Sequence, residues 1–277
     1  MSKKRILFVT QEMEPYTVLS EMSELVRKLP QHVQESGYEI RVLMPKFGTI
    51  NERRHRLHEV VRLSGMNIIV DDEDYPLIIK VASLPGARMQ VYFLDNEEFF
   101  KRKFVFEDAE GKPFADNQER TVFFCKGVLE TVKKFGWPPD IIHCHGPMTA
   151  LLPLFKQKVY HNDPIFEDTK MLYSVYDNGL DASFDEKFLE IAAINDLEDE
   201  DVAPYSVDGK VNLNMGGIHY ADAIVKGSSS LPADVTKAID ARGVEVHDYQ
   251  PVEDQLAAIV SFYEELLPQE EEEEETK

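Results

Sequence analysis

The chain has 277 residues and a formal net charge of −21, from 30 Lys and Arg against 51 Asp and Glu. This length allows one large domain or two small ones, and 43% apolar residues are typical of a globular protein. An acidic surface repels phosphate backbones and anionic lipids, which argues against nucleic-acid and membrane partners. No apolar run has the length of a membrane span, and the run after the basic N-terminus is too short for a signal peptide. We therefore expect a cytoplasmic protein.

The two cysteines indicate neither a disulfide framework nor a zinc site. Cys125 and Cys144 form no C-x-x-C pair and have no metal-ligand spacing, so both are predicted to be buried thiols in a reducing compartment.

The first third of the chain has the pattern of a β-α-β unit followed by an insertion. Residues 6–10 are an apolar run typical of a buried strand, residues 20–35 have helical spacing with an expected break at Pro30, and residues 38–44 are the second strand. Three strand patterns then follow with little helix between them, which predicts an antiparallel hairpin inserted at the sheet edge. Those patterns cover residues 57–70, 75–84 and 89–94. The basic cluster at residues 53–56 is either a solvated loop or an anion contact.

The rest of the chain alternates helix and strand patterns. This alternation predicts a doubly wound, Rossmann-like α/β domain with a mostly parallel sheet. We expect that domain to span residues 1–268, followed by a disordered acidic tail at 269–277. Helices are predicted at residues 96–103, 117–135, 149–159, 181–194, 209–220, 232–242 and 251–267, and strands at 141–145, 170–175, 221–226 and 244–249.

The strongest candidate for a functional site is the end of the strand at residues 141–145. Strand geometry places His143 and His145 on one face and Cys144 on the other. Ligands of parallel α/β sheets bind at the carboxyl ends of the strands, so these histidines could line a cleft. The more ordinary interpretation is that they are hydrogen-bonded structural residues. A metal site is the least supported alternative, because no third ligand has a suitable spacing.

Common nucleotide-binding motifs are absent from the sequence. There is no G-x-G-x-x-G after the first strand and no Walker A loop. Residues 227–230 could offer amides to a phosphate, but an ordinary turn is the simpler interpretation. The Gly216-Gly217 pair is better explained by close packing than by a phosphate cradle.

Four stretches, in the same order, resemble motifs of bacterial glycogen synthases and plant starch synthases. Residues 140–153 resemble "D-V-V-H-x-H-D-W-x-T-A-L-L-P", and residues 6–15 resemble the first strand and its "S-E-M-x-P" loop. Residues 29–48 and 209–223 resemble "L-P … G-H-x-V-x-V-x-x-P-x-Y-G" and "G-K-x-N-x-L-K-x-G-I-x-Y-A-D-A". The resemblance implies the N-terminal half of a GT-B fold. It also implies metal-independent glucosyl transfer from ADP-glucose or UDP-glucose to an α-1,4-glucan, with no resident cofactor.

The same comparison of motifs shows several departures. The family pattern "K-T-G-G-L" is replaced by residues 18–22, so that Val18 stands for the lysine and Ser20-Glu21 for the glycine pair. The side chains of Ser20 and Glu21 then fill the space in which the glycine backbone would approach a phosphate. The carboxylate of Glu21 would also repel a diphosphate. The aspartate after His145 is lost, and Tyr176 replaces a cleft histidine. Because the resemblance covers only the N-terminal domain of the GT-B fold, we expect the C-terminal domain to be missing from this chain.

These features predict a synthase-like domain that is deficient in glucosyl transfer alone and has no catalytic residues of its own. We expect it to bind an α-glucan or sugar nucleotide, or a protein partner at the face of the second domain. One alternative is an active transferase completed by a second chain, and another is an unrelated Rossmann-like enzyme with its site at residues 177–178 or 228–230. The residues expected to line the cleft are Glu12, Pro15, Ser20, Glu21, His143, His145 and Tyr176.

Overall fold

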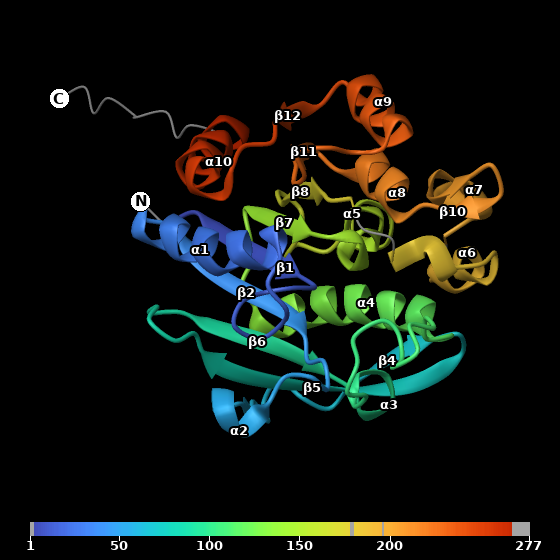
Figure 1. Ribbon diagram of the computed structural model, residues 1–277, viewed down its shortest axis with the longest axis horizontal. Helices are drawn as coiled ribbons and strands as arrows, with labels where there is room; N and C mark the ends of the chain where they lie inside the picture. The colour runs from blue at the N-terminus through green and yellow to red at the C-terminus, as the bar shows by residue number, and fades with distance from the viewer. Residues whose placement is uncertain (1–2, 178–179, 196, 268–277) are drawn as a thin grey trace.

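The computed structural model describes residues 3–177, 180–195 and 197–267, so the predicted acidic tail lies outside the described residues (Figure 1). Its main sheet has the strand order β12-β11-β8-β7-β1-β2-β6-β5-β3, with β4 paired to β5. All pairs from β12 to β6 are parallel, which confirms the doubly wound α/β prediction. These strands are β1 (Arg5–Thr10), β2 (Glu39–Pro45), β6 (Gln90–Asp95), β7 (Ile141–His145), β8 (Lys170–Val175), β11 (Ala223–Lys226) and β12 (Glu245–His247).

An antiparallel insertion extends one edge of the sheet, as predicted. It consists of β3 (His58–Glu59), β4 (Met66–Val70) and β5 (Glu73–Ser83). The long strand β5 pairs antiparallel with β3, β4 and β6, and thereby joins the insertion to the parallel strands. The first predicted strand of this region, at residues 57–70, is divided into β3 and β4, because residues 61–63 form a turn between them.

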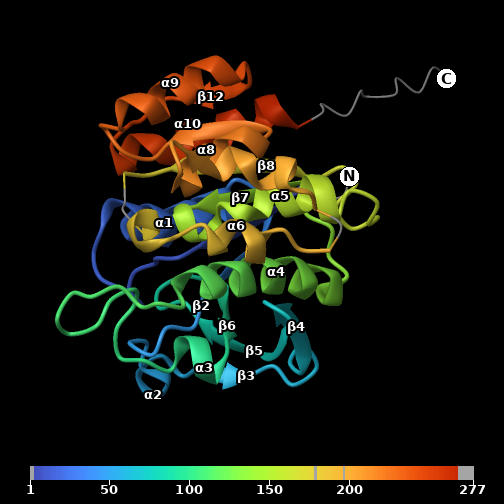
Figure 2. The same ribbon diagram turned by 90° about the vertical axis from the view of Figure 1, so that its right-hand side faces the viewer.

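Helices cover both faces of the sheet. Figure 1 shows α1 (Glu21–Glu35) and α10 (Val252–Leu266) on one side, and α4 (Asn117–Phe135), α5 (Leu151–Leu154), α8 (Leu213–Tyr220) and α9 (Ala233–Arg242) on the other. In Figure 2, α8, α5 and α4 lie one below another along that second face. The remaining α-helices are α2 (Glu52–His55), α3 (Glu97–Phe100), α6 (Lys187–Ala192) and α7 (Asp199–Val202).

Three helix predictions were wrong in detail. The helix expected at residues 149–159 is divided into a 3-10 turn, α5 and a π-helical segment (Phe155–Val159). The helix expected at 181–194 shrinks to α6 with a preceding 3-10 turn (Leu180–Ser183). The helix expected at 209–220 begins only at Leu213, because β10 (Lys210–Val211) forms a small hairpin with β9 (Ser206–Val207). Pro30, by contrast, lies within the uninterrupted helix α1.

Close backbone packing explains the paired glycines of α8. A Cβ atom on Gly216 would lie 2.1 Å from the Tyr205 ring, and one on Gly217 would lie 2.6 Å from Tyr173. These contacts confirm the packing interpretation and bring α8 against β8, which fixes the position of the strand end at Val175.

The strand order changes direction between the neighbouring parallel strands β1 and β7. From β1 the chain proceeds to β2 on one side, whereas from β7 it proceeds through β8 and β11 to β12 on the other. Such a switch point leaves a crevice outside the carboxyl ends of the two central strands. Thr10 and His145 are register partners there, so the predicted site residues converge at this position.

Candidate functional site

The carboxyl ends of β1, β7 and β8 bring the predicted residues together, and we call this region the strand-end surface. It comprises Glu12, Pro15 and Ser20 from the β1–α1 loop, Glu21 at the start of α1, His143 and His145 from β7, and Tyr176 after β8. Gln11 and Gly146 complete its base, because the Gln11 side-chain oxygen accepts a 2.9 Å hydrogen bond from the Met148 amide. Gly146 has φ +87°, and a Cβ there would lie 2.8 Å from that oxygen.

His143 lies below this surface and is held by two hydroxyl groups. Its Nδ1 is 2.6 Å from the Tyr263 hydroxyl of α10, and its Nε2 is 2.7 Å from the Ser174 hydroxyl. Burial lowers the pKa of His143 well below its usual value, and the neighbouring His145 adds to this effect. The ring is therefore neutral at pH 7, with one nitrogen donating and the other accepting. Because both ring nitrogens of His143 already have hydrogen-bond partners, His143 can affect a bound ligand only through the residues that it contacts.

His145 is the histidine closer to the strand end. Its ring centroid lies 4.0 Å from that of His143, and its Nδ1 is 3.1 Å from the Tyr176 hydroxyl. Burial lowers the pKa of His145 to about 3 and raises the pKa of the Tyr176 phenol, so both groups are neutral at pH 7. The His145 Nε2 atom is buried and has no hydrogen-bond partner among the described residues. Such an atom costs free energy and is available to a polar partner.

The β1–α1 loop is closed by a hydrogen bond between two predicted residues. The Ser20 hydroxyl donates to Glu12 Oε2 at 2.5 Å and also accepts from the Ser23 amide as the N-cap of α1. Glu21 accepts a 2.7 Å hydrogen bond from the Tyr249 hydroxyl, which follows β12. Pro15, after a cis peptide bond, is exposed in the same loop.

Two exposed apolar side chains stand at the rim of the strand-end surface. Val18 and Leu19 are 75% and 73% exposed, among the highest values for large apolar side chains in the described residues. They occupy the positions where the resembled pattern has lysine and threonine. The rim therefore presents apolar and acidic groups rather than a cation.

Sequence reasoning missed four residues that shape this region. Gln11 and Ser174 occupy strand-end positions, so strand periodicity could have identified them. Tyr263 could not be identified, because it lies 120 residues after the histidine it contacts. Gly227 also supports the site, since a Cβ there would lie 2.6 Å from the Tyr176 ring.

The other candidate residues from the sequence form no second functional site within the described part of the chain. The Asp177 amide donates to the Ser228 hydroxyl at 3.2 Å, which is a turn contact, and Asn178 lies outside the described residues. No group of three potential metal ligands occurs among the residues that the structure describes. Cys125 and Cys144 are both buried free thiols, as predicted. No helix within the described ranges is long and apolar enough to cross a bilayer.

Comparisons with known proteins identify the family. A family model described as the starch synthase catalytic domain matches residues 5–247. The glycogen synthase of Chlorobium limicola is 37% identical over 227 residues, which cover 81% of this chain and 45% of that protein. The glycogen synthase of Pelodictyon phaeoclathratiforme is 36% identical with the same coverage. The chain thus spans about half the length of the curated relatives it matches.

A solved structure confirms the fold. The catalytic domain of starch synthase IV from Arabidopsis thaliana, bound to ADP and acarbose, superposes with a TM-score of 0.73 at 17% identity. The match covers 92% of this chain and 53% of that one.

Proposed function

Because this chain belongs to the family of starch synthase catalytic domains, we propose that it binds an α-1,4-glucan at the strand-end surface and does not transfer glucose by itself. The observation that carries the proposal is the 2.5 Å hydrogen bond from Ser20 to Glu12, which closes the β1–α1 loop. In the resembled pattern, glycine at this position lets backbone approach a phosphate. Here Ser20 and Glu21 replace the glycine pair, and the Glu21 carboxylate repels a diphosphate.

The chemistry of the rim suits an uncharged, hydroxyl-rich ligand. Sugar hydroxyls can donate to the carboxylates of Glu12 and Glu21, and hydrogen bonds to charged acceptors are the stronger kind. The apolar faces of glucose rings can pack on Val18 and Leu19. His145 and Tyr176 form a neutral base beneath them, which adds no charge that would favour a nucleotide.

A second candidate function is glucosyl transfer completed by another chain. Val18 and Leu19 favour it, because exposed apolar side chains also suit a protein interface. In that case the strand-end surface forms one wall of the active-site cleft, and the partner chain supplies the nucleotide site. Such an assembly would work in the cytoplasm. An unrelated Rossmann-like enzyme is no longer needed to account for the chain.

The direct test is transfer of labelled glucose into glycogen from ADP-glucose and, in parallel, from UDP-glucose. We expect no incorporation above a heat-treated control, even at high protein concentration. Incorporation that Tyr176→Ala abolishes would contradict the proposal and favour catalysis by an assembly.

Glycogen binding is tested by affinity electrophoresis of the wild type and the V18S/L19S variant. We expect glycogen to retard the wild type and to retard the variant less, because its rim lacks the apolar contacts. Val61→Ser is the matched control, since Val61 is 78% exposed and lies in the antiparallel insertion. Equal retardation of all three proteins would place glucan binding elsewhere on the chain.

A further inference from the structure

A second region of the molecule has the opposite charge to the strand-end surface. A cavity of about 800 Å³ lies between α2 and the loop after α3, and we call it the basic cavity. Figures 1 and 2 both place α2 and α3 at the end of the molecule opposite α9. The residues that line it and carry the argument are Lys46, Gly48, Glu52, Arg53, Lys101 and Lys103. Four cations and one carboxylate meet here in a chain whose formal net charge is −21.

The single carboxylate is already neutralised by two lysines. Glu52 Oε1 is 2.7 Å from Lys46 Nζ and 2.8 Å from Lys80 Nζ, and these two hydrogen bonds lower the pKa of Glu52. Lys80 also contacts Asp95 at 2.8 Å. This cluster of alternating charges fixes the floor of the basic cavity and pairs its carboxylate with Lys46 and Lys80 rather than with the other cations.

Three cations therefore lack a strong anionic partner. Arg53 makes no side-chain hydrogen bond or ion pair with any residue that the structure describes. Lys101 is 3.8 Å from Glu97, and both side chains are more than three-quarters exposed, so that pair is weak. Within the described part of the chain, Lys103 donates only to the Gly48 carbonyl, at 3.4 Å.

The wall that carries the two lysines is held in place by packing against Gly48. A Cβ atom on Gly48 would lie 2.1 Å from the Arg102 carbonyl oxygen and 2.4 Å from that of Lys101. Only a residue without a side chain permits this approach, and the approach brings Lys101 and Lys103 to the side of Arg53.

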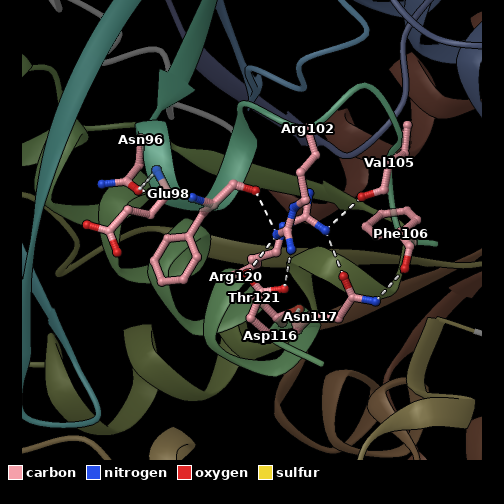
Figure 3. Close-up of polar contacts among 10 residues, drawn as sticks. Asn96, Glu98, Arg102, Val105, Phe106, Asp116, Asn117, Arg120 and Thr121 are labelled. Carbon is pink, nitrogen blue, oxygen red and sulfur yellow. Dashed lines mark hydrogen bonds and ion pairs between the residues drawn. The ribbon is translucent and has the colours of Figure 1, made fainter. Parts of the chain in front are cut away.

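Polar contacts of Arg102 and Arg120 hold the same wall in place (Figure 3). Arg102 makes two hydrogen bonds to Asp116, of 2.8 and 2.7 Å, and stacks on Phe114. Arg120, which is 1% exposed, donates to the Val105 carbonyl and to the Asn117 side chain at 2.7 Å. The lysines thus stand on a fixed loop, and a preorganised site loses less entropy when it binds.

We propose that the basic cavity binds the diphosphate group of a small molecule through Arg53, Lys101 and Lys103. The guanidinium group can hold two phosphoryl oxygens at once, and the ammonium groups supply further positive charge. The volume is that of an ordinary small-molecule site. The site is separate from the strand-end surface, and the contact of Tyr16 with His55, with ring centroids 5.0 Å apart, connects the two regions.

Isothermal titration with inorganic pyrophosphate at constant ionic strength tests the proposal. We expect the wild type to bind and Arg53→Ala to bind about tenfold more weakly, as loss of a charged contact predicts. Arg54→Ala is the matched control, since Arg54 is an exposed cation of the same helix outside the lining of the basic cavity. It should bind pyrophosphate as the wild type does. Lys103→Ala should resemble Arg53→Ala.

A parallel titration with ADP distinguishes the source of the diphosphate. Tighter binding of ADP than of pyrophosphate, with the same loss in Arg53→Ala, indicates an organic diphosphate, and the reverse order indicates the inorganic ion. Absence of pyrophosphate binding to the wild type would overturn the proposal. Equal weakening in the Arg53 and Arg54 variants would also overturn it, because the attraction would then be general.

Discussion

The strand-end surface and the basic cavity show how one acidic chain separates two kinds of chemistry. At the strand-end surface, His143, His145 and Tyr176 are neutral because they are buried, and the rim is acidic and apolar. At the basic cavity, Arg53, Lys101 and Lys103 stay in solvent, whereas Arg120 behind them is buried. Burial removes charge, whereas exposure on a rigid loop preserves it. The first region therefore suits an uncharged ligand and the second an anion.

Gly48→Ala should disrupt the basic cavity and cause the largest loss of folding stability among these predictions. The new Cβ would meet a backbone carbonyl at 2.1 Å, so the loop must move, at a cost of about 3 kcal/mol in the free energy of unfolding. Urea denaturation measures this loss. Gly111→Ala is the control, because it has φ +78° but open space around it and should cost about 1 kcal/mol. Equal losses in the two variants would show that the wall of the basic cavity is pliable.

Acidification should weaken the strand-end surface instead. The pKa of His145 is about 3 when folded and near 6.5 when unfolded, so the unfolded chain binds an extra proton below pH 6.5. Stability therefore falls as the pH falls through the window from 6.5 towards 3. Between pH 8 and pH 5 this histidine alone should cost roughly 2 kcal/mol.

The measurement is urea denaturation at pH 8 and at pH 5. His145→Gln should lose roughly 2 kcal/mol less than the wild type between these values, whatever its own stability. His161→Gln, at an exposed histidine, should retain the dependence of the wild type. An unaltered pH dependence in His145→Gln would mean that the buried ring accepts a proton in the folded protein.

Adding positive charge should make the strand-end surface resemble the basic cavity. The variant V18K/S20G/E21G restores the resembled lysine and glycine pair and changes the local charge by about +2 at pH 7. We expect about tenfold tighter ADP binding, the smallest of the three effects. The titration belongs in an Arg53→Ala background, so that the basic cavity contributes less. Val61→Lys is the charge control, and an equal gain there would indicate general attraction.

Much of the architecture could be predicted because local patterns agree with the fold. The limits of α4 and β8 match the predicted ranges, since long amphipathic and fully buried runs have strong periodicity. Prediction failed between residues 181 and 212, where short elements depend on tertiary contacts. Asp181, for example, accepts a hydrogen bond from the Leu213 amide at the start of α8. Such a contact leaves no periodic signal.

The sequence by itself determined the family resemblance, the face shared by His143 and His145, and the replacement of a glycine by Glu21. These follow from residue identity and from strand geometry, which are local. Only the tertiary structure decided that Tyr263 holds His143 and that residues 53 and 101–103 meet around one cavity. Those contacts join segments about 50 to 120 residues apart, and packing rather than spacing brings them together.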